Sequence, residues 1–298
     1  MYGGFTYLRG TQSILKASRK VMSQQLLIAP RLRCGIGNRL FQTVAAIGAA
    51  ERISGTPVFF LPRMSHYDHG NFELIRKLFP TLQLVESAPE WFEVEETDDR
   101  QLPPSLENIP SNTRLIVLSG FFQNVLNFPS LTNPHLPALP RMGPLRDSWA
   151  IHFRFGDYLI LPHYHVPLSH YYYYCVTKNI PKQSTITLFS DSPGRLLPIS
   201  EELTRIGYTV EIYNNPDELE TLLEFSRCSK GSICSNSTFA WWAAYFAWKN
   251  SNDSYTAFFP NRWILGRELH SLFTLPFTQV VELERIPASP RLESFSHS

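Results

Sequence analysis

Short apolar runs alternate with segments of helical spacing along the chain, and this alternation limits the possible fold more than any other feature. Residues 26–29 form an apolar run, residues 40–52 carry apolar side chains mainly at helical spacing, and residues 57–61 are apolar again. A strand, a helix and a second strand in this order are typical of α/β domains built on a parallel sheet. Residues 115–118 predict a further buried strand.

The second half of the chain repeats the pattern. Expected strands lie at 149–153, 185–189, 209–212 and 232–234, and expected helices start near 170 and lie near 201–206, 217–228 and 238–248. Between the halves, five prolines fall within residues 129–144. Because proline fixes φ and cannot donate to a sheet, this segment is the best candidate for a domain boundary. We therefore expect an α/β fold with two Rossmann-like domains facing a cleft.

The predicted organisation has four parts. Residues 1–27 form a basic N-terminal tail, 28–146 the first domain, 147–275 the second domain and 276–298 a C-terminal tail. No acidic residue precedes Glu51, so the first 25 residues are either a transit-like peptide, the remnant of an anchored stem, or a flexible basic tail.

Bulk composition excludes several classes of protein. The hydrophobic share of 43% and the charged share of 18% are typical of a globular protein. A net charge of +1 argues against a nucleic-acid partner. The four cysteines show no CxxC pair and are expected to be reduced and mostly buried. No stretch approaches the roughly 20 apolar residues that span a bilayer.

Polar residues follow three of the predicted strands in the second half. They are His152, Arg154 and Asp157; Ser190 and Asp191; and Ser235, Asn236, Ser237 and Thr238. In an open parallel sheet, ligands bind at the carboxyl ends of strands, so these groups are expected to converge on one ligand. An arginine can hold two phosphate oxygens at once and stabilise the charge that grows on a departing phosphate. Arg154 is thus the leading candidate for a catalytic residue.

Two further segments have patterns that are typical of ligand-binding sites. Gly35 and Gly37 open the first helix, where backbone N–H groups approach a bound anion. With only two glycines and no acidic residue about 20 positions later, the turn does not fit a nicotinamide cofactor. The segment Asn236–Thr238 precedes two tryptophans at a helix start, and either ligand binding or ordinary N-capping explains it. No D-x-D occurs, which predicts chemistry without a metal ion or other cofactor.

Five motifs occur in a fixed order along the chain. They are Gly-Ile-Gly-Asn-Arg-Leu-Phe-Gln (35–42), Leu-Ser-Gly-Phe-Phe-Gln (118–123), Ile-His-Phe-Arg-Phe-Gly-Asp-Tyr (151–158), Phe-Ser-Asp (189–191) and Ser-Asn-Ser-Thr-Phe-Ala-Trp-Trp-Ala-Ala (235–244). From about residue 28 to residue 263 the series resembles the α-1,2-fucosyltransferases, glycosyltransferase family 11. The resemblance implies a GT-B fold, GDP-fucose as donor, a galactose-containing glycan as acceptor, and metal-independent inversion at the anomeric carbon.

The resemblance also implies residue roles. Arg154 matches the arginine that binds the donor diphosphate, His152 the histidine near the guanine, and Asn38 an asparagine facing the reacting centre. Ser237 and Thr238 match residues lining the donor pocket. By the same resemblance, the first domain is the acceptor side and the second the GDP-sugar side. Relatives occur as anchored Golgi enzymes and as anchorless bacterial ones, so Golgi and cytoplasmic locations both stay open.

The chain also departs from the family pattern. A second arginine usually follows the matched one, and here it is Phe155; a glutamine usually follows the matched asparagine, and here it is Arg39. The family's acidic residue falls near Thr221, with Asp217 and Glu220 close by. These departures motivate the alternative of a degraded relative that binds nucleotide sugar or glycan without turnover.

An inverting transfer needs help in deprotonating the acceptor hydroxyl. His163 and His165 lie in the loop after the Arg154 strand and are the candidates for this base, together with Asp157. For Asp157 we favour a structural role, as a carboxylate that bonds loop N–H groups. A strong base is not required, because positioning and leaving-group stabilisation carry many inverting reactions.

Overall fold

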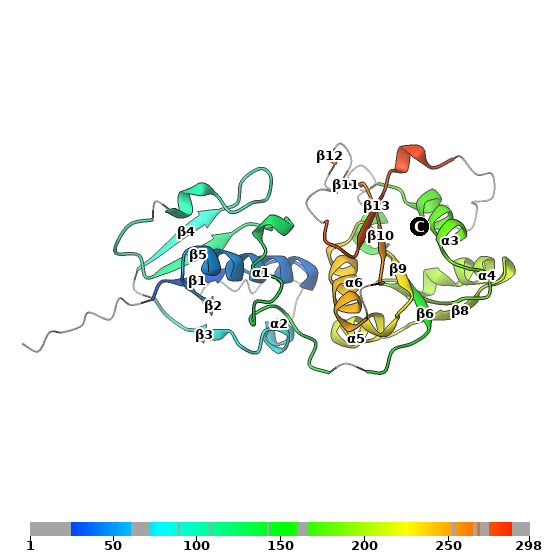
Figure 1. The fold of residues 1–298 in the computed structure, drawn as a ribbon, viewed down its shortest axis with the longest axis horizontal. Helices are drawn as coiled ribbons and strands as arrows, with labels where there is room; N and C mark the ends of the chain where they lie inside the picture. Colours follow the sequence, from blue (N-terminus) through cyan, green and yellow to red (C-terminus); the bar gives the residue numbers. More distant parts are fainter. Residues whose placement is uncertain are drawn as a thin grey trace, which may run out of the picture.

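The fold is that of a computed structural model of the chain, and it contains two α/β domains side by side (Figure 1). The structure describes residues 25–60, 72–88, 90–107, 109–141, 143–159, 166–251, 254–264, 267–268 and 274–287.

The first domain is built on a five-stranded parallel sheet with the order β3-β2-β1-β5-β4. Its strands are β1 (Leu27–Pro30), β2 (Thr56–Phe60), β3 (Gln83–Val85), β4 (Trp91–Glu95) and β5 (Leu115–Ser119). Its helices are α1 (Ile36–Arg52) and α2 (Phe72–Leu78), with short 3-10 turns at η2 (Pro104–Glu107) and η3 (Val125–Asn127).

The second domain is built on a six-stranded parallel sheet with the order β13-β10-β9-β6-β7-β8. Its strands are β6 (Ser148–Phe153), β7 (Thr185–Ser190), β8 (Thr209–Ile212), β9 (Gly231–Ile233), β10 (Ala257–Pro260) and β13 (Thr278–Val281). Its helices are α3 (Ser169–Asn179), α4 (Leu197–Arg205), α5 (Glu218–Arg227) and α6 (Thr238–Asn250). The remaining short elements are η4 (Gly156–Leu159), η5 (Pro193–Leu196), β11 (Arg262–Ile264), β12 (Arg267–Glu268) and η7 (Leu283–Arg285).

The strand order of the second sheet is that of a Rossmann domain. Counted along the chain from β6, it reads 6-5-4-1-2-3, with the order reversing between β6 and β9. The first sheet also places its first strand in the middle and reverses between β1 and β5. The prediction of two Rossmann-like domains facing a cleft, the GT-B arrangement, is confirmed.

Two segments differ from the sequence-based expectation. The strand β4, Trp91–Glu95, was not predicted, and it pairs with β5 along the edge of the first sheet. Only Val94 of this strand is buried, which explains why alternation did not reveal it. At the other end of the chain, β13 pairs with β10, so the second sheet extends beyond residue 275.

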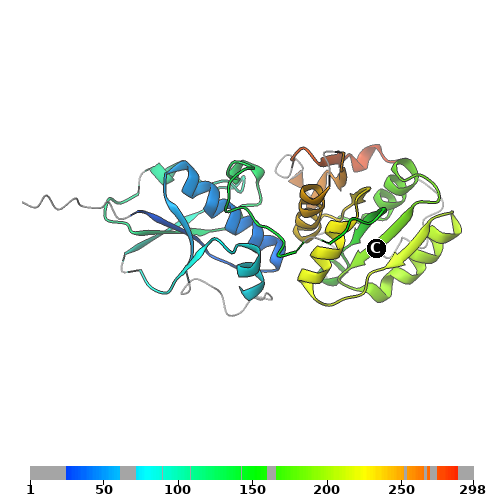
Figure 2. The same ribbon diagram turned by 60° about the horizontal axis from the view of Figure 1, so that its bottom comes forward.

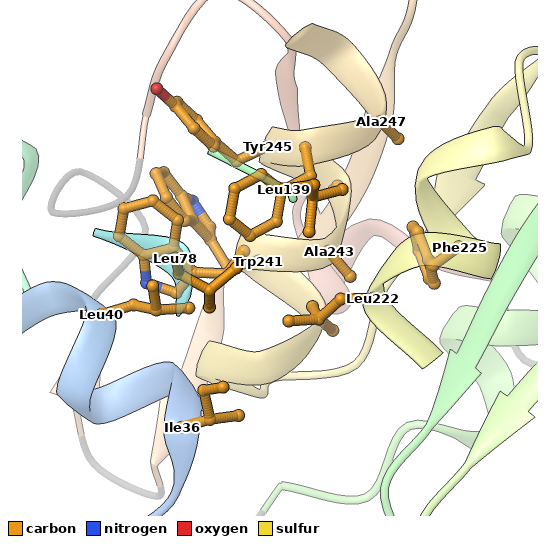
Figure 3. Packing of buried hydrophobic residues seen from close by; sticks show 14 of the residues in the cluster. Ile36, Leu40, Leu78, Leu139, Leu222, Phe225, Trp241, Ala243, Tyr245 and Ala247 are labelled. Carbon is orange, nitrogen blue, oxygen red and sulfur yellow. The ribbon is translucent and has the colours of Figure 1, made fainter. Parts of the chain in front are cut away.

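One hydrophobic cluster joins the two domains. Figures 1 and 2 show α5 and α6 on the side of the second sheet that faces the first domain, with α1 running toward them. Phe41 of α1 lies 5.0 Å from Trp241 and 5.2 Å from Trp242 of α6, measured between ring centroids. Figure 3 shows Ile36 and Leu40 of α1 in the same cluster as Trp241 of α6. The packing of α1 against α6 therefore fixes how the two sheets face each other.

Candidate functional site

A cavity of about 990 Å³ lies between the two domains, and segments from both sheets line it. A second cavity, lined by residues of α3 and β13 among others, measures about 220 Å³. The lining residues from the first domain are 34–38, 100, 121 and 123; those from the second are 152, 154, 158, 190, 191, 193, 214–216, 218, 221, 236–239, 263 and 264.

The cavity lies at the switch points of both sheets. The turn after β1 and the segment after β5 reach it from the first domain, and the segments after β6 and β9 reach it from the second. Open α/β sheets bind their ligands at this place because neighbouring loops diverge there and leave a crevice. The topology thus brings together side chains from distant parts of the chain; those of Asn38 and Thr238 are 200 positions apart.

Arg154 lies just beyond β6 and is held by an acidic neighbour from β7. Its Nη1 atom is 3.1 Å from Oδ2 of Asp191, and its guanidinium lies 5.7 Å from the ring centre of Tyr158. The backbone N–H of Phe155 donates to Oδ1 of Asp191 at 2.9 Å. At Gly156, an added Cβ would come within 2.4 Å of Asp191 Oδ2. Glycine is therefore required for the loop to close on the carboxylate that orients Arg154.

His152 lies in β6, two residues before Arg154, and is buried in the cavity wall. Its Nδ1 atom lies 2.8 Å from the hydroxyl oxygen of Ser235, and the hydroxyl of Tyr172 donates to its carbonyl oxygen. Burial lowers the pKa of His152 to about 4, and the Arg154 charge adds to this, while Asp191 opposes it. The imidazole is consequently neutral at neutral pH, and it offers a hydrogen bond rather than a charge.

The turn Asn236–Thr238 opens α6 without the usual side-chain cap. Ser237 occupies the N-cap position, yet its hydroxyl does not bond a backbone N–H of the first turn. Thr238 donates from Oγ1 to Oδ1 of Asn38 in the other domain, at 3.3 Å. Asn236 donates from Nδ2 to the carbonyl of Trp263, but its buried Oδ1 has no hydrogen-bond partner among the described residues. The first backbone N–H groups of α6 thus lie at the cavity with no side-chain cap.

The turn before α1 meets α6 from the opposite side. An added Cβ at Gly37 would lie 2.5 Å from both the nitrogen of Phe239 and the carbonyl carbon of Thr238. Oδ1 of Asn38 accepts from Nε2 of Gln123 at 2.5 Å as well as from Thr238. As in α6, the N-cap of α1, Gly35, provides no side-chain hydrogen bond, and no acidic residue occupies the first turn. Two helix N-termini, each with a partial positive charge, therefore meet at one cavity.

The acidic residue that α5 contributes to the cavity wall differs from those that the sequence suggested for this segment. Glu218 and Thr221 border the cavity. Glu220 instead pairs with Arg141, and Asp217 caps α5 by accepting from the N–H groups of residues 219 and 220. Glu218 lines the cavity, and desolvation by the surrounding protein raises the pKa of its carboxyl group. The positive charges of Arg39 and Arg154 oppose this rise. The sequence placed an acidic group in this segment correctly but did not single out Glu218.

Most of the predicted site residues lie together on the cavity wall. They are Gly37, Asn38, His152, Arg154, Asp191, Asn236, Ser237 and Thr238. His163 and His165 lie outside the described residues, as does the side chain of Asp157, so the proposal of a base among them is unchanged. No disulfide joins any of the four cysteines in the described part of the chain, and three of them, at 175, 228 and 234, are buried.

The two departures from the family pattern lie off the cavity. Phe155 is buried in the core of the second domain, where its ring stacks on Phe153. Arg39 is buried and donates from Nε to the carbonyl of Cys34 at 2.7 Å. Neither Phe155 nor Arg39 is among the residues that line the cavity.

Sequence reasoning missed several lining residues. Arg100 and Gln123 line the first-domain wall, and Tyr158 and Trp263 line the second-domain wall. Gln123 and Tyr158 belong to the quoted motifs, so their position after a strand was a usable signal. Arg100 follows a short edge strand that the sequence did not reveal, and nothing in its local pattern separates it from a surface arginine.

Two features are absent from the described part of the chain. No cluster of three or more His, Cys, Asp or Glu side chains that could hold a metal ion occurs in the described ranges. Within the same ranges, no helix combines the length and apolar character needed to cross a bilayer.

Comparisons with known proteins give structural neighbours of low similarity. No protein-family model matches the chain, and no curated protein does. The structure of NodZ alpha-1,6-fucosyltransferase soaked with GDP-fucose matches with 16% identity and a TM-score of 0.42, covering 75% of this chain and 92% of that one. Fucosyltransferase NodZ from Bradyrhizobium matches with 14% identity and a TM-score of 0.42, covering 74% and 92%. POFUT1 in complex with GDP matches with 11% identity and a TM-score of 0.43, covering 75% and 94%.

Proposed function

We propose that this protein is a galactoside α-1,2-fucosyltransferase, an inverting and metal-independent enzyme that moves fucose from GDP-fucose to the 2-hydroxyl of a galactoside glycan. The observation that carries the proposal is the position of Arg154 at the Rossmann switch point, beside the uncapped N-terminus of α6. A guanidinium and free backbone N–H groups at one point form a favourable site for a diphosphate.

The donor side of the proposal uses residues of the second domain. Arg154, with Ser237, Thr238 and the first N–H groups of α6, would hold the diphosphate, and Asp191 keeps the guanidinium in place. The Glu218 carboxylate is a hydrogen-bond acceptor on the cavity wall and suits the N–H groups of a guanine base. The neutral His152 would contact the nucleotide by hydrogen bonding.

In the proposed reaction, the acceptor hydroxyl oxygen attacks the anomeric carbon from the face opposite the phosphate. A bond forms between that oxygen and the carbon, the carbon–phosphate oxygen bond breaks, and its electron pair leaves with GDP. Arg154 and the helix N-terminus stabilise the charge on the departing diphosphate. The hydroxyl proton passes to a base, for which His163, His165 and Asp157 are the candidates. Asn38 lines the cavity from the first domain and would face this centre.

The alternative is a degraded relative that binds the donor without turnover. It is motivated by Phe155, which is buried in the core where the family would place a second arginine. The donor diphosphate then depends on Arg154 as its main cation.

The test is to incubate the protein with GDP-fucose and a panel of β-galactosides, measure released GDP, and determine the linkage of the product by NMR. We expect release with the wild type and a loss of roughly a hundredfold or more with Arg154→Ala, the scale of removing one stabiliser of a leaving charge. The control is Arg205→Ala, because Arg205 is exposed on α4 and, among the described residues, its side chain pairs with Glu202 alone. If the wild type binds GDP but releases none above buffer, the degraded relative is the correct interpretation.

A further inference from the structure

The first-domain wall of the cavity carries a group of residues that the proposed donor chemistry does not use. Its centre is Phe121, just after β5, with two arginines packed on its ring. The guanidinium carbons of Arg33 and Arg100 lie 4.5 Å and 5.2 Å from the ring centre. Stacking on an aromatic face holds a guanidinium plane and leaves its N–H groups pointing outward.

Arg100 is the member of this group that reaches the cavity. Its Nη1 donates to Oε1 of Gln123 at 2.8 Å, and Gln123 in turn donates to Asn38, which lies at the proposed reaction centre. Its backbone has a φ of 55°, in the left-handed region that non-glycine residues rarely adopt. Strained residues of this kind are frequent at functional sites, where the surrounding structure holds them in place.

The positive charge of Arg100 is not neutralised by an ion pair in the described part of the chain. Of the five N–H donors of its guanidinium, one has a described acceptor, the Gln123 oxygen. The nearby carboxylate of Glu96 accepts instead from the backbone N–H groups of Phe121 and Phe122, at 2.9 Å and 2.6 Å. On the opposite wall, by contrast, Arg154 is paired with Asp191. The first-domain wall thus offers a fixed cation with open donors.

We infer that Arg100, supported by Phe121 and Gln123, binds an anionic substituent of the acceptor glycan, a sulfate or a carboxylate. This inference rests on the proposed function, since it assigns the first-domain wall to the acceptor. A planar fork of charged donors suits a sulfate or carboxylate group. A neutral sugar would leave the same charge without a partner. The hydrogen-bonded series Arg100, Gln123 and Asn38 would then connect acceptor recognition with the reaction centre.

The test compares paired acceptors that differ only in charge. One is a neutral β-galactoside disaccharide, and the other two are the same disaccharide carrying a sulfate or a carboxylate, with the 2-hydroxyl free in each. Their affinities for the GDP-bound protein are measured by calorimetry, and kcat/KM for transfer is measured alongside. We use the full chain as wild type and as Arg100→Gln. The matched control is Arg114→Gln, because Arg114 is exposed just before β5, and its side chain has no hydrogen bond or ion pair with any described residue.

The wild type should bind at least one of the anionic acceptors about tenfold or more tighter than the neutral one, as expected for a hydrogen bond to a charged group. Arg100→Gln should remove this preference for an anionic acceptor, and Arg114→Gln should behave as the wild type. Whether the sulfate or the carboxylate is preferred identifies the substituent.

Equal affinity of the wild type for all three acceptors would overturn the inference. So would a loss of GDP affinity in Arg100→Gln with no change in acceptor preference, because Arg100 would then contact the donor. The calorimetric comparison needs no turnover, so a protein that fails to transfer fucose yet shows the Arg100-dependent preference contradicts only the proposed function.

Discussion

At the scale of single residues, Gly37 shows how tightly the two domains meet. A Cβ at this position would lie 2.5 Å from backbone atoms of the other domain, and backbone cannot rotate out of the way as a side chain can. Gly35, two positions earlier, has no heavy atom within 4 Å of an added Cβ and has a φ of −64°. The two glycines of one turn therefore differ in what a methyl group would meet.

We expect Gly37→Ala to lower the free energy of unfolding by about 1–3 kcal/mol, the usual range for overpacking, and to lower GDP affinity by displacing the α6 N-terminus. Gly35→Ala should leave both quantities close to wild type. Chemical denaturation followed by fluorescence, with calorimetry for GDP, measures the difference. Equal stability of the two variants would show that the domains separate easily at this contact.

The sequence predicts where the site lies and what kind of group it binds, but it does not identify every side chain that lines the site. The residues that follow buried strands, such as Arg154 and Asn236, were predicted because strand ends converge in a parallel sheet. The distinction between Glu218 and Glu220 was not predictable, because it depends on the rotation of α5 and on Arg141, which pairs with Glu220 from the connector. The contact of Arg100 with Phe121 joins two strand ends whose pairing appears only in the fold.

At the scale of elements, α5 and α6 begin at the cavity in different ways. Asp217 accepts from two backbone N–H groups of α5, as an ordinary cap does. Ser237 occupies the same position in α6 but forms no such bond. A side chain that leaves the first turn of a buried helix uncapped contributes little to the stability of that helix.

We therefore expect Asp217→Ala to lower the free energy of unfolding by about 1 kcal/mol, the usual value for a lost cap. Ser237→Ala should change stability by less than about 0.5 kcal/mol but weaken GDP binding severalfold. Thermal unfolding and calorimetry of both variants separate these effects. A Ser237→Ala variant with reduced stability and unchanged GDP affinity would assign Ser237 to capping and remove it from the proposed donor site.

Helices and strands with a strong apolar periodicity were predicted from the sequence. Strands that form mainly because a neighbouring strand pairs with them were not. The segments for α1, α3, α5, α6 and β5 to β9 were found from apolar spacing and cap residues. The edge strands β4 and β13 were missed, because an edge strand buries few side chains and needs only one neighbour to pair with. The α/β class survived these errors, since it depends on the order of the central strands.

At the scale of the whole molecule, two switch points face each other and share one hydrophobic cluster. Side chains of α1 and of α6 belong to the same buried group, whose aromatic centre is formed by Phe41, Phe128, Trp241 and Trp242. The proline-rich connector between the domains adds Leu139 to this cluster. A shared core couples the two domains more strongly than a linker alone.

This coupling predicts that the two domains of the wild type unfold together. Phe41→Ala would remove the ring that lies against both tryptophans and should cost about 3–5 kcal/mol. Because the loss falls on the interface, the first domain should then unfold at a lower denaturant concentration than the second.

Hydrogen exchange at β2 and β7, one central strand from each sheet, reports the two transitions separately. Leu203→Ala is the control, because Leu203 is buried within the second domain alone and should lower the second transition without exposing the first domain earlier. Two separate transitions already present in the wild type would show that the shared cluster does not couple the domains.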